Sequence, residues 1–218
     1  MTASNFLSRR QFSWLVAGAA AGVAAVPMLS TRQAFAQSQD SAQDLEALLK
    51  NRVLGDPDAP VTIDEYSSLT CPHCRAFHEG ALPPLKENYI DTGKVKLVMH
   101  DFPLDGAAAA AAMMARCAPE ERYFPVIEAL FDQQAEWSRA DNVLESLAQI
   151  GRFAGMSPDT LQSCFANEAL FNALRERRDA YSEQRGISST PTFFVGDEKI
   201  VGAQPYETFV AAIEAQMT

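Results

Sequence analysis

Cysteine and histidine are scarce in this sequence. Its 218 residues include 4 cysteines and 3 histidines, and of the cysteines only Cys71 and Cys74 lie close together along the chain. Structural zinc sites usually combine two ligand pairs, each at short spacing, whereas Cys117 and Cys164 stand alone. A structural zinc site is therefore disfavoured. A metal or copper half-site with Cys71, Cys74 and His78 as ligands stays open as an alternative.

The chain also has no excess of positive charge and no long apolar run. The net charge of the chain is -10 at pH 7, which argues against nucleic acid or an anionic membrane surface as a partner. The apolar run Phe12–Val26 is rich in Ala and Gly, and it is shorter than the ~20 residues that a membrane-spanning helix needs. No internal repeat is present. The length suits one domain, or one domain that carries an insertion.

The first 36 residues have the composition of an export signal. They contain three arginines and no acidic residue, and the apolar run is followed by Ala34-Phe35-Ala36, an A-x-A cleavage pattern. These features predict that residues 1–36 are a signal peptide rather than part of the fold. Retention of this segment as an uncleaved anchor is left open.

The arginine pair refines the export route. Ser8-Arg9-Arg10-Gln11-Phe12 resembles the twin-arginine export signal, although Ser13 and Trp14 depart from its usual ending. A general secretory signal is the alternative. Either route leads to a bacterial periplasm, where disulfides persist, so we expect a periplasmic protein.

Cys71-Pro72-His73-Cys74 is the most informative segment of the chain. It follows an apolar run, Val61–Leu69, that is typical of a strand, and it opens a segment with helical spacing of apolar residues. A thiol at a helix start faces unpaired N–H groups and the positive end of the helix dipole, and both stabilise a thiolate. Because the thiolate is the reacting form in disulfide exchange, the segment predicts a redox site. His73 adds a further donor or a positive charge beside Cys71.

A second segment supports this hypothesis. Ser189–Gly196 (S-T-P-T-F-F-V-G) reads as a turn that enters a short buried strand, and its X-Pro bond is a candidate cis peptide. Together, C-P-H-C and T-P-T-F-F-V-G resemble the thioredoxin superfamily, and most closely its DsbA-like thiol:disulfide oxidoreductases. The resemblance implies that Pro191 is cis and lies against the two cysteines, and that Thr190 contacts substrate backbone. Many DsbA-type enzymes have valine before this proline, and threonine is familiar in the isomerase branch.

The resemblance extends to Glu65 and to a helical insertion. Glu65 matches the buried acidic residue that perturbs the thiol pair in this family and can relay protons; a solvated strand residue is the alternative. Asp101–Leu104 and Ala107–Gln134 resemble the entry into the helical insertion of the family. His78 and His100 are interpreted as a helix-face residue and a local hydrogen-bonding residue.

The fold class that follows is α/β, a thioredoxin-like fold with an inserted all-helical domain. We expect a signal peptide (1–36), an N-terminal helix and linker (37–54), a thioredoxin-like domain (55–104 and 186–218) and an inserted helical domain (105–185). Periodicity predicts strands at 61–67, 95–100, 192–195 and 199–201. It predicts helices at 44–52 and 71–89, the latter broken after its third turn by Pro83-Pro84.

Cys117 and Cys164 both fall in the inserted block. Their number is even and the compartment is oxidising, so a disulfide is plausible. The resemblance also implies a pair here, since one branch of DsbA-like proteins has a second, non-catalytic disulfide in the helical domain. Two separate buried thiols are the alternative.

The sequence therefore predicts an enzyme that introduces disulfides into reduced or unfolded exported proteins. Cys71 would be the outer, reactive sulfur, and Cys74 the resolving one. The family implies reoxidation by a membrane quinone-linked thiol oxidase, and we expect no bound cofactor. An isomerase or reductase of the same fold stays open, as does the metal-handling module.

Overall fold

The computed structural model describes residues 44–217, so the predicted signal peptide lies outside the described residues. Five strands form one mixed sheet in the order β1-β3-β2-β4-β5. They are β1 (Arg52–Leu54), β2 (Val61–Ser67), β3 (Val95–Asp101), β4 (Thr192–Val195) and β5 (Glu198–Val201). The central pair β2 and β3 is parallel, and the other neighbouring strands are antiparallel.

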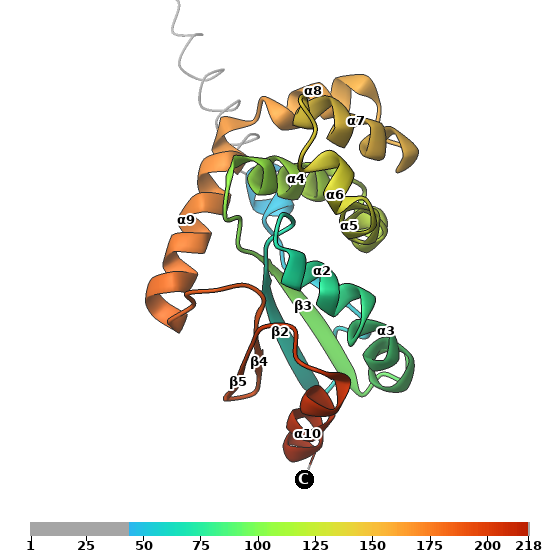
Figure 1. Cartoon of the computed structure of the whole chain (residues 1–218), viewed down its shortest axis with the longest axis vertical. Coiled ribbons are helices and arrows are strands. Elements are labelled where there is room, and N and C mark those ends of the chain that lie inside the picture. The colour runs from blue at the N-terminus through green and yellow to red at the C-terminus, as the bar shows by residue number, and fades with distance from the viewer. Residues whose placement is uncertain (1–43, 218) are drawn as a thin grey trace, which may run out of the picture. The chain divides into compact units, whose positions relative to one another are not determined.

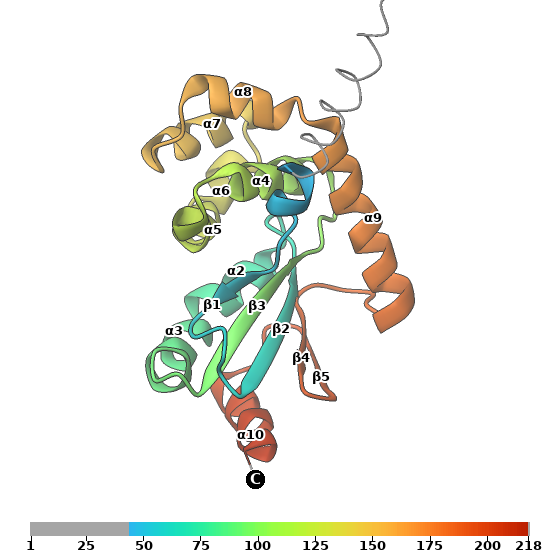
Figure 2. The same cartoon turned by 180° about the vertical axis from the view of Figure 1, so that it is seen from behind.

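Helices cover the sheet and build a separate block (Figures 1 and 2). Between β2 and β3 lie α2 (Pro72–Glu79), α3 (Leu82–Leu85) and a π-helical turn (Lys86–Ile90), and α10 (Tyr206–Gln216) follows β5. Between β3 and β4 the chain forms only helices: α4 (Gly106–Cys117), a 3-10 turn (Glu120–Arg122), α5 (Tyr123–Asp132), α6 (Gln134–Trp137), α7 (Val143–Phe153), α8 (Pro158–Phe165) and α9 (Glu168–Arg185). This run of helices is the helical insert below. No helix within residues 44–217 has the length and apolar character needed to cross a bilayer.

Side-chain alternation along β2 directs its residues to two different layers. Glu65 points toward α2, where it meets His78, whereas Tyr66 packs edge-on against Tyr181 of α9. Under α2, Phe77 contacts Phe193 of β4 with ring centroids 4.4 Å apart. These apolar contacts fix the active-site helix on the sheet, because each buried aromatic ring removes a large area from water.

The strands match the sequence prediction more closely than the helix that begins at the cysteines. Strands β2 and β4 have the predicted bounds, and β3 and β5 differ by one residue. The predicted helix 71–89 instead ends at Glu79, before Pro83-Pro84. The prolines then lie in the first turn of α3, where a missing N–H costs nothing, so the prolines help to start a helix rather than to break one.

Strand β1 was not predicted. Periodicity predicts a helix over residues 44–52, which includes Arg52, but in the structure the helical residues of this segment end at 48. Residues 52–54 instead pair with β3, Val53 opposite Val98. A three-residue edge strand carries no periodicity of its own, since its partner supplies all its ladder hydrogen bonds.

Candidate active site

Cys71 lies between β2 and α2. It is the N-cap residue of α2, with an extended backbone (φ -81, ψ 120). Pro72 occupies the first helical position, where its fixed φ suits the helix. The backbone N–H groups of His73 and Cys74 therefore point toward the Cys71 sulfur and stabilise negative charge on it.

These contacts lower the pKa of the Cys71 thiol from 9.0 to about 5. The largest cause is a hydrogen bond from the Cys74 thiol; burial opposes the shift, and hydrogen bonds from Thr190 and the backbone N–H groups add to it. Cys71 therefore has the lower thiol pKa of the pair, and this pKa favours its thiolate form near neutral pH.

Cys74 has the opposite environment. Its side chain is fully buried, and its Sγ accepts a hydrogen bond from the Ser68 N–H at 3.4 Å. Burial raises the pKa of the Cys74 thiol, and the neighbouring Cys71 sulfur raises it further. Both cysteines are free, and their thiol pKa values are shifted in opposite directions, down for Cys71 and up for Cys74.

Thr190 and Pro191 lie against this pair although they are far away in sequence. The Thr190–Pro191 peptide bond is cis. The carbonyl oxygen of Thr190 is 3.3 Å from the Cys71 Sγ, and it accepts a hydrogen bond when the thiol is protonated. The loop before β4 is thus brought to the start of α2, and the Thr190 side chain is buried there.

His73 supplies a hydrogen-bond donor, one of its two expected contributions. Its side chain is exposed, and its part in the stabilisation of the Cys71 thiolate is its backbone N–H. No hydrogen bond of its imidazole occurs in the part of the chain that the structure describes.

His78 and Glu65 form a buried pair beneath the cysteines. Glu65 is fully buried, and His78 Nε2 lies 3.0 Å from its Oε1 and 3.2 Å from its Oε2. His78 does lie on a face of α2, and that face is turned toward Glu65; the alternative of a solvated Glu65 is wrong. His78 stands four residues after Cys74, on the same side of α2, and this spacing was the available signal. His100 does make local hydrogen bonds, 2.7 Å to Asp64.

Gln134 is a site residue that sequence reasoning missed. Its side-chain amide on α6 donates to the carbonyl oxygens of Leu69 and Cys71 at 2.8 and 3.0 Å. On the same loop, the Thr70 hydroxyl donates to Asp105 Oδ2 at 2.8 Å. A glutamine in a polar helical stretch carries no sequence signal, because its partners are backbone atoms more than sixty residues away.

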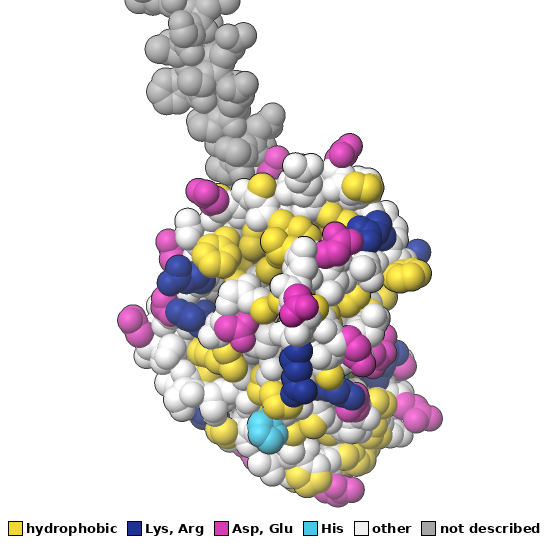
Figure 3. Space-filling view, turned by 45° about the horizontal axis from the view of Figure 1, so that its top comes forward, with side chains coloured by type: hydrophobic (Ala, Val, Ile, Leu, Met, Phe, Trp, Pro, Cys, Tyr) yellow, Lys and Arg dark blue, Asp and Glu magenta, His cyan; other side chains and the backbone are white. Residues whose placement is uncertain are grey.

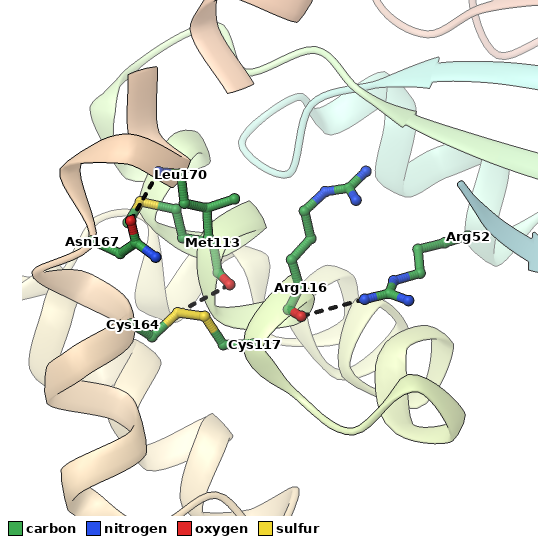
Figure 4. The surroundings of a disulfide bond; sticks show 7 residues. All are labelled: Arg52, Met113, Arg116, Cys117, Cys164, Asn167 and Leu170. Carbon is green, nitrogen blue, oxygen red and sulfur yellow. Dashed lines mark hydrogen bonds between the residues drawn. A yellow bond between two sulfur atoms is a disulfide. The ribbon is translucent and has the colours of Figure 1, made fainter. Parts of the chain in front are cut away.

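Cys117 and Cys164 are joined by a disulfide within the helical insert (Figure 4). Cys117 ends α4, and Cys164 lies on α8 with its Sγ 3.1 Å from the Met113 carbonyl oxygen. The bond ties the two helices together. Within residues 44–217, no group of three or more His, Cys, Asp or Glu side chains lies close enough to hold a metal ion.

Comparison with known proteins gives the family. A family model described as thioredoxin matches residues 47–215. This chain belongs to the thioredoxin family. Its sheet, with an all-helical insert between β3 and β4, confirms the predicted thioredoxin-like fold class.

Two solved structures show how closely this thioredoxin family member resembles DsbA-type proteins. The crystal structure of α-DsbA1 from Wolbachia pipientis matches with a TM-score of 0.72 and 29% identity over 77% of this chain and 91% of that chain. Oxidised BdbD from Bacillus subtilis matches with a TM-score of 0.69 and 25% identity, over 77% and 92% of the two chains.

Relatives by sequence carry similar names. Disulfide bond formation protein D of Bacillus subtilis is 25% identical over 189 residues, 83% of each chain. A protein of Rickettsia conorii with the provisional name protein-disulfide oxidoreductase is 31% identical over 163 residues, which are 74% of this chain and 58% of the relative. The chain thus spans a little over half the length of such Rickettsia relatives.

Proposed function

We propose that this protein is a thiol:disulfide oxidoreductase that introduces disulfides into exported proteins through Cys71 and Cys74. The observation that carries the proposal is the opposite environment of the two sulfurs: hydrogen-bond donors lower the pKa of Cys71, and burial raises the pKa of Cys74. Stabilisation of the reduced form makes the disulfide form a strong oxidant. DsbA-like relatives and fold neighbours support this class of reaction.

The reaction starts from the Cys71–Cys74 disulfide. A substrate thiolate attacks the Cys71 Sγ; the S–S bond to Cys74 breaks, and Cys74 takes up a proton. A second substrate thiolate then attacks the substrate sulfur of the mixed disulfide, and Cys71 departs as a thiolate. The substrate loses two electrons and two protons and gains a disulfide, and the protein becomes the dithiol. The low pKa of Cys71 makes it the better leaving group in the second step.

Substrate segments would align on Thr190 and Pro191, beside Cys71. Beside the loop that leads into Cys71, Leu104 is 52% exposed, and its backbone N–H donates to the Ser68 hydroxyl. Figure 3 shows hydrophobic patches among acidic and basic side chains on one face of the molecule. Apolar surface of this kind suits unfolded chains, which expose their own apolar residues.

Location and partner complete the proposal. The leader predicted at residues 1–36 would export the chain to the periplasm by the twin-arginine route. There a membrane quinone-linked thiol oxidase would restore the Cys71–Cys74 disulfide. Thr190 before the cis-proline favours a second candidate, a disulfide isomerase or reductase of the same fold, which would be a weaker oxidant than the first.

Titration of the reduced protein tests the assignment. Ultraviolet absorbance of the thiolate should follow one group with a pKa of about 5. Between that pH and about pH 9, reduction takes up one proton, because Cys71 stays ionised and Cys74 protonated. The reduction potential should then fall by about 30 mV per pH unit near pH 7, and by about 60 mV per unit below pH 5. A titration like that of an ordinary thiol would sink the proposal, and a potential near that of thioredoxin would select the second candidate.

Glu65 and His78 would carry the proton that Cys74 gains or loses. His78 also lines a surface cavity of about 380 Å³, which gives the buried pair a route to solvent. We expect Glu65→Gln, which retains a hydrogen bond to His78 but not the charge, to slow the steps at Cys74 by about tenfold to a hundredfold. Stopped-flow fluorescence of the exchange measures this rate.

The neighbouring half-exposed Asp64 supplies the control. Asp64→Asn removes a carboxylate on the other face of β2, where it pairs with His100. Its exchange rate should stay at the wild-type value. Equal rates for wild type and Glu65→Gln across pH 5 to 8 would remove Glu65 from the mechanism.

A further inference from the structure

The active-site loop, residues 68–71 between β2 and α2, carries the nucleophile and is held by the helical insert at two points. Gln134 donates both amide hydrogens to this loop, to the carbonyl oxygens of Leu69 and Cys71. Thr70, between them, donates its hydroxyl hydrogen to Asp105. Asp105 in turn caps the start of α4 by accepting from the Ala108 N–H at 2.7 Å. The loop therefore cannot rotate without breaking contacts to two parts of the insert, the start of α4 and α6.

Gln134 is itself held firmly. It is 5% exposed on α6, a four-residue helix. One turn on, the buried Trp137 donates its indole N–H to the Leu130 carbonyl oxygen of α5 at 2.7 Å. This bond anchors α6 to α5, and Figure 1 shows α6 beyond the N-terminal end of α2. A buried amide with both donors satisfied and a fixed backbone is a rigid support rather than a surface side chain.

The position of Gln134 affects the hydrogen bonds that reach the Cys71 sulfur. The N–H groups that face the Cys71 sulfur belong to His73 and Cys74, which directly follow the active-site loop. A hydrogen bond to a negative sulfur weakens steeply when its angle or distance degrades. In addition, the positive end of the Gln134 amide dipole points at the carbonyl oxygen of Cys71, the residue that carries the nucleophilic sulfur.

We propose that Gln134 is a positioning residue through which the helical insert fixes the active-site loop and makes the Cys71–Cys74 pair more oxidising. The inference rests on the proposed function and deepens it, since it assigns to the insert a part in setting the reduction potential. Gln134 touches neither sulfur and acts only through the backbone of Leu69 and Cys71.

Three substitutions test this role. Gln134→Met keeps the volume of the side chain and removes both donors. Gln134→Glu keeps the shape, and its buried carboxyl, protonated between two carbonyl oxygens, can donate only one hydrogen bond. Gln133→Met, one position earlier on an exposed side chain, is the matched control. For each, the thiolate is titrated by ultraviolet absorbance, and the equilibrium with reduced and oxidised glutathione is measured on the folded protein.

We expect the thiolate pKa of Gln134→Met to rise by about one unit, which corresponds to the loss of about one hydrogen bond of stabilisation. The equilibrium constant for oxidation of the dithiol by glutathione disulfide should rise about tenfold. Gln134→Glu keeps one of the two donors and should shift both quantities in the same direction by a smaller amount, and Gln133→Met should match the wild type.

Wild-type values for both Gln134 variants would overturn the inference, even if the variants melt at lower temperature, because a merely structural role moves the melting point and not the potential. A failure of Gln134→Met to fold leaves Gln134→Glu to decide. A wild-type Cys71 that titrates as an ordinary thiol would instead refute the proposed function, so the two failures are distinguishable.

Discussion

Cys71→Ser should abolish oxidation of a reduced peptide, leaving only the uncatalysed rate. A serine hydroxyl neither forms a disulfide nor ionises near neutral pH, so the outer sulfur that receives the substrate thiolate is lost. Measurement of peptide disulfide formation by mass spectrometry, with glutathione disulfide as the final oxidant, checks this outcome.

Cys74→Ser gives the complementary result. This variant keeps the Cys71 thiolate but has no internal thiol to displace a bound substrate. Mixed with a peptide disulfide, it should accumulate a covalent adduct at Cys71 that dithiothreitol releases. Peptide oxidation at the wild-type rate in Cys71→Ser, or an adduct at any other cysteine of Cys74→Ser, would contradict the assigned roles.

Removal of the Cys117–Cys164 disulfide should cost the fold much of its stability. The bond closes a loop with a sequence separation of 47, and in the chain-entropy model such a loop contributes about 4 kcal/mol. Cys117→Ala/Cys164→Ala should therefore lower the melting temperature by about 10 °C. The measurement is thermal unfolding by circular dichroism, in a Cys71→Ser/Cys74→Ser background that prevents thiol exchange.

The exposed neighbour Ser163 supplies the control for this experiment. Ser163→Ala in the same background should melt within about 1 °C of it, since surface substitutions have small effects. An unchanged melting temperature in the double alanine variant would mean that the two cysteines act as packing residues and that the bond adds nothing to stability.

Much of the active site could be predicted from sequence where local pattern carries the information. The strand before Cys71, the proline after it and the segment Thr190-Pro191 lie in short stretches whose hydrophobicity and turn chemistry are self-contained. The bounds of β2 and β4 were correct for this reason. The start of α2 followed as well, since an N-cap position needs only its own first turn.

Other parts could not be predicted because their partners lie elsewhere in the chain. Strand β1 exists only as the neighbour of β3, and Gln134 acts on backbone oxygens that it meets only after the insert has folded. The His78–Glu65 pair depends on the packing of α2 against β2. Burial also decides whether an acidic residue is solvated, and burial is a property of the assembled core.

By itself, the sequence determined which two cysteines lie at the start of α2, which proline stands beside them and which fold carries them, because each is encoded by neighbouring residues. Tertiary structure alone decided how differently the two sulfurs ionise. That difference arises from the burial of Cys74 and from donors on separate elements, α2 and the Thr190 loop. Chain segments more than a hundred residues apart must meet before one sulfur can hold a charge that the other cannot.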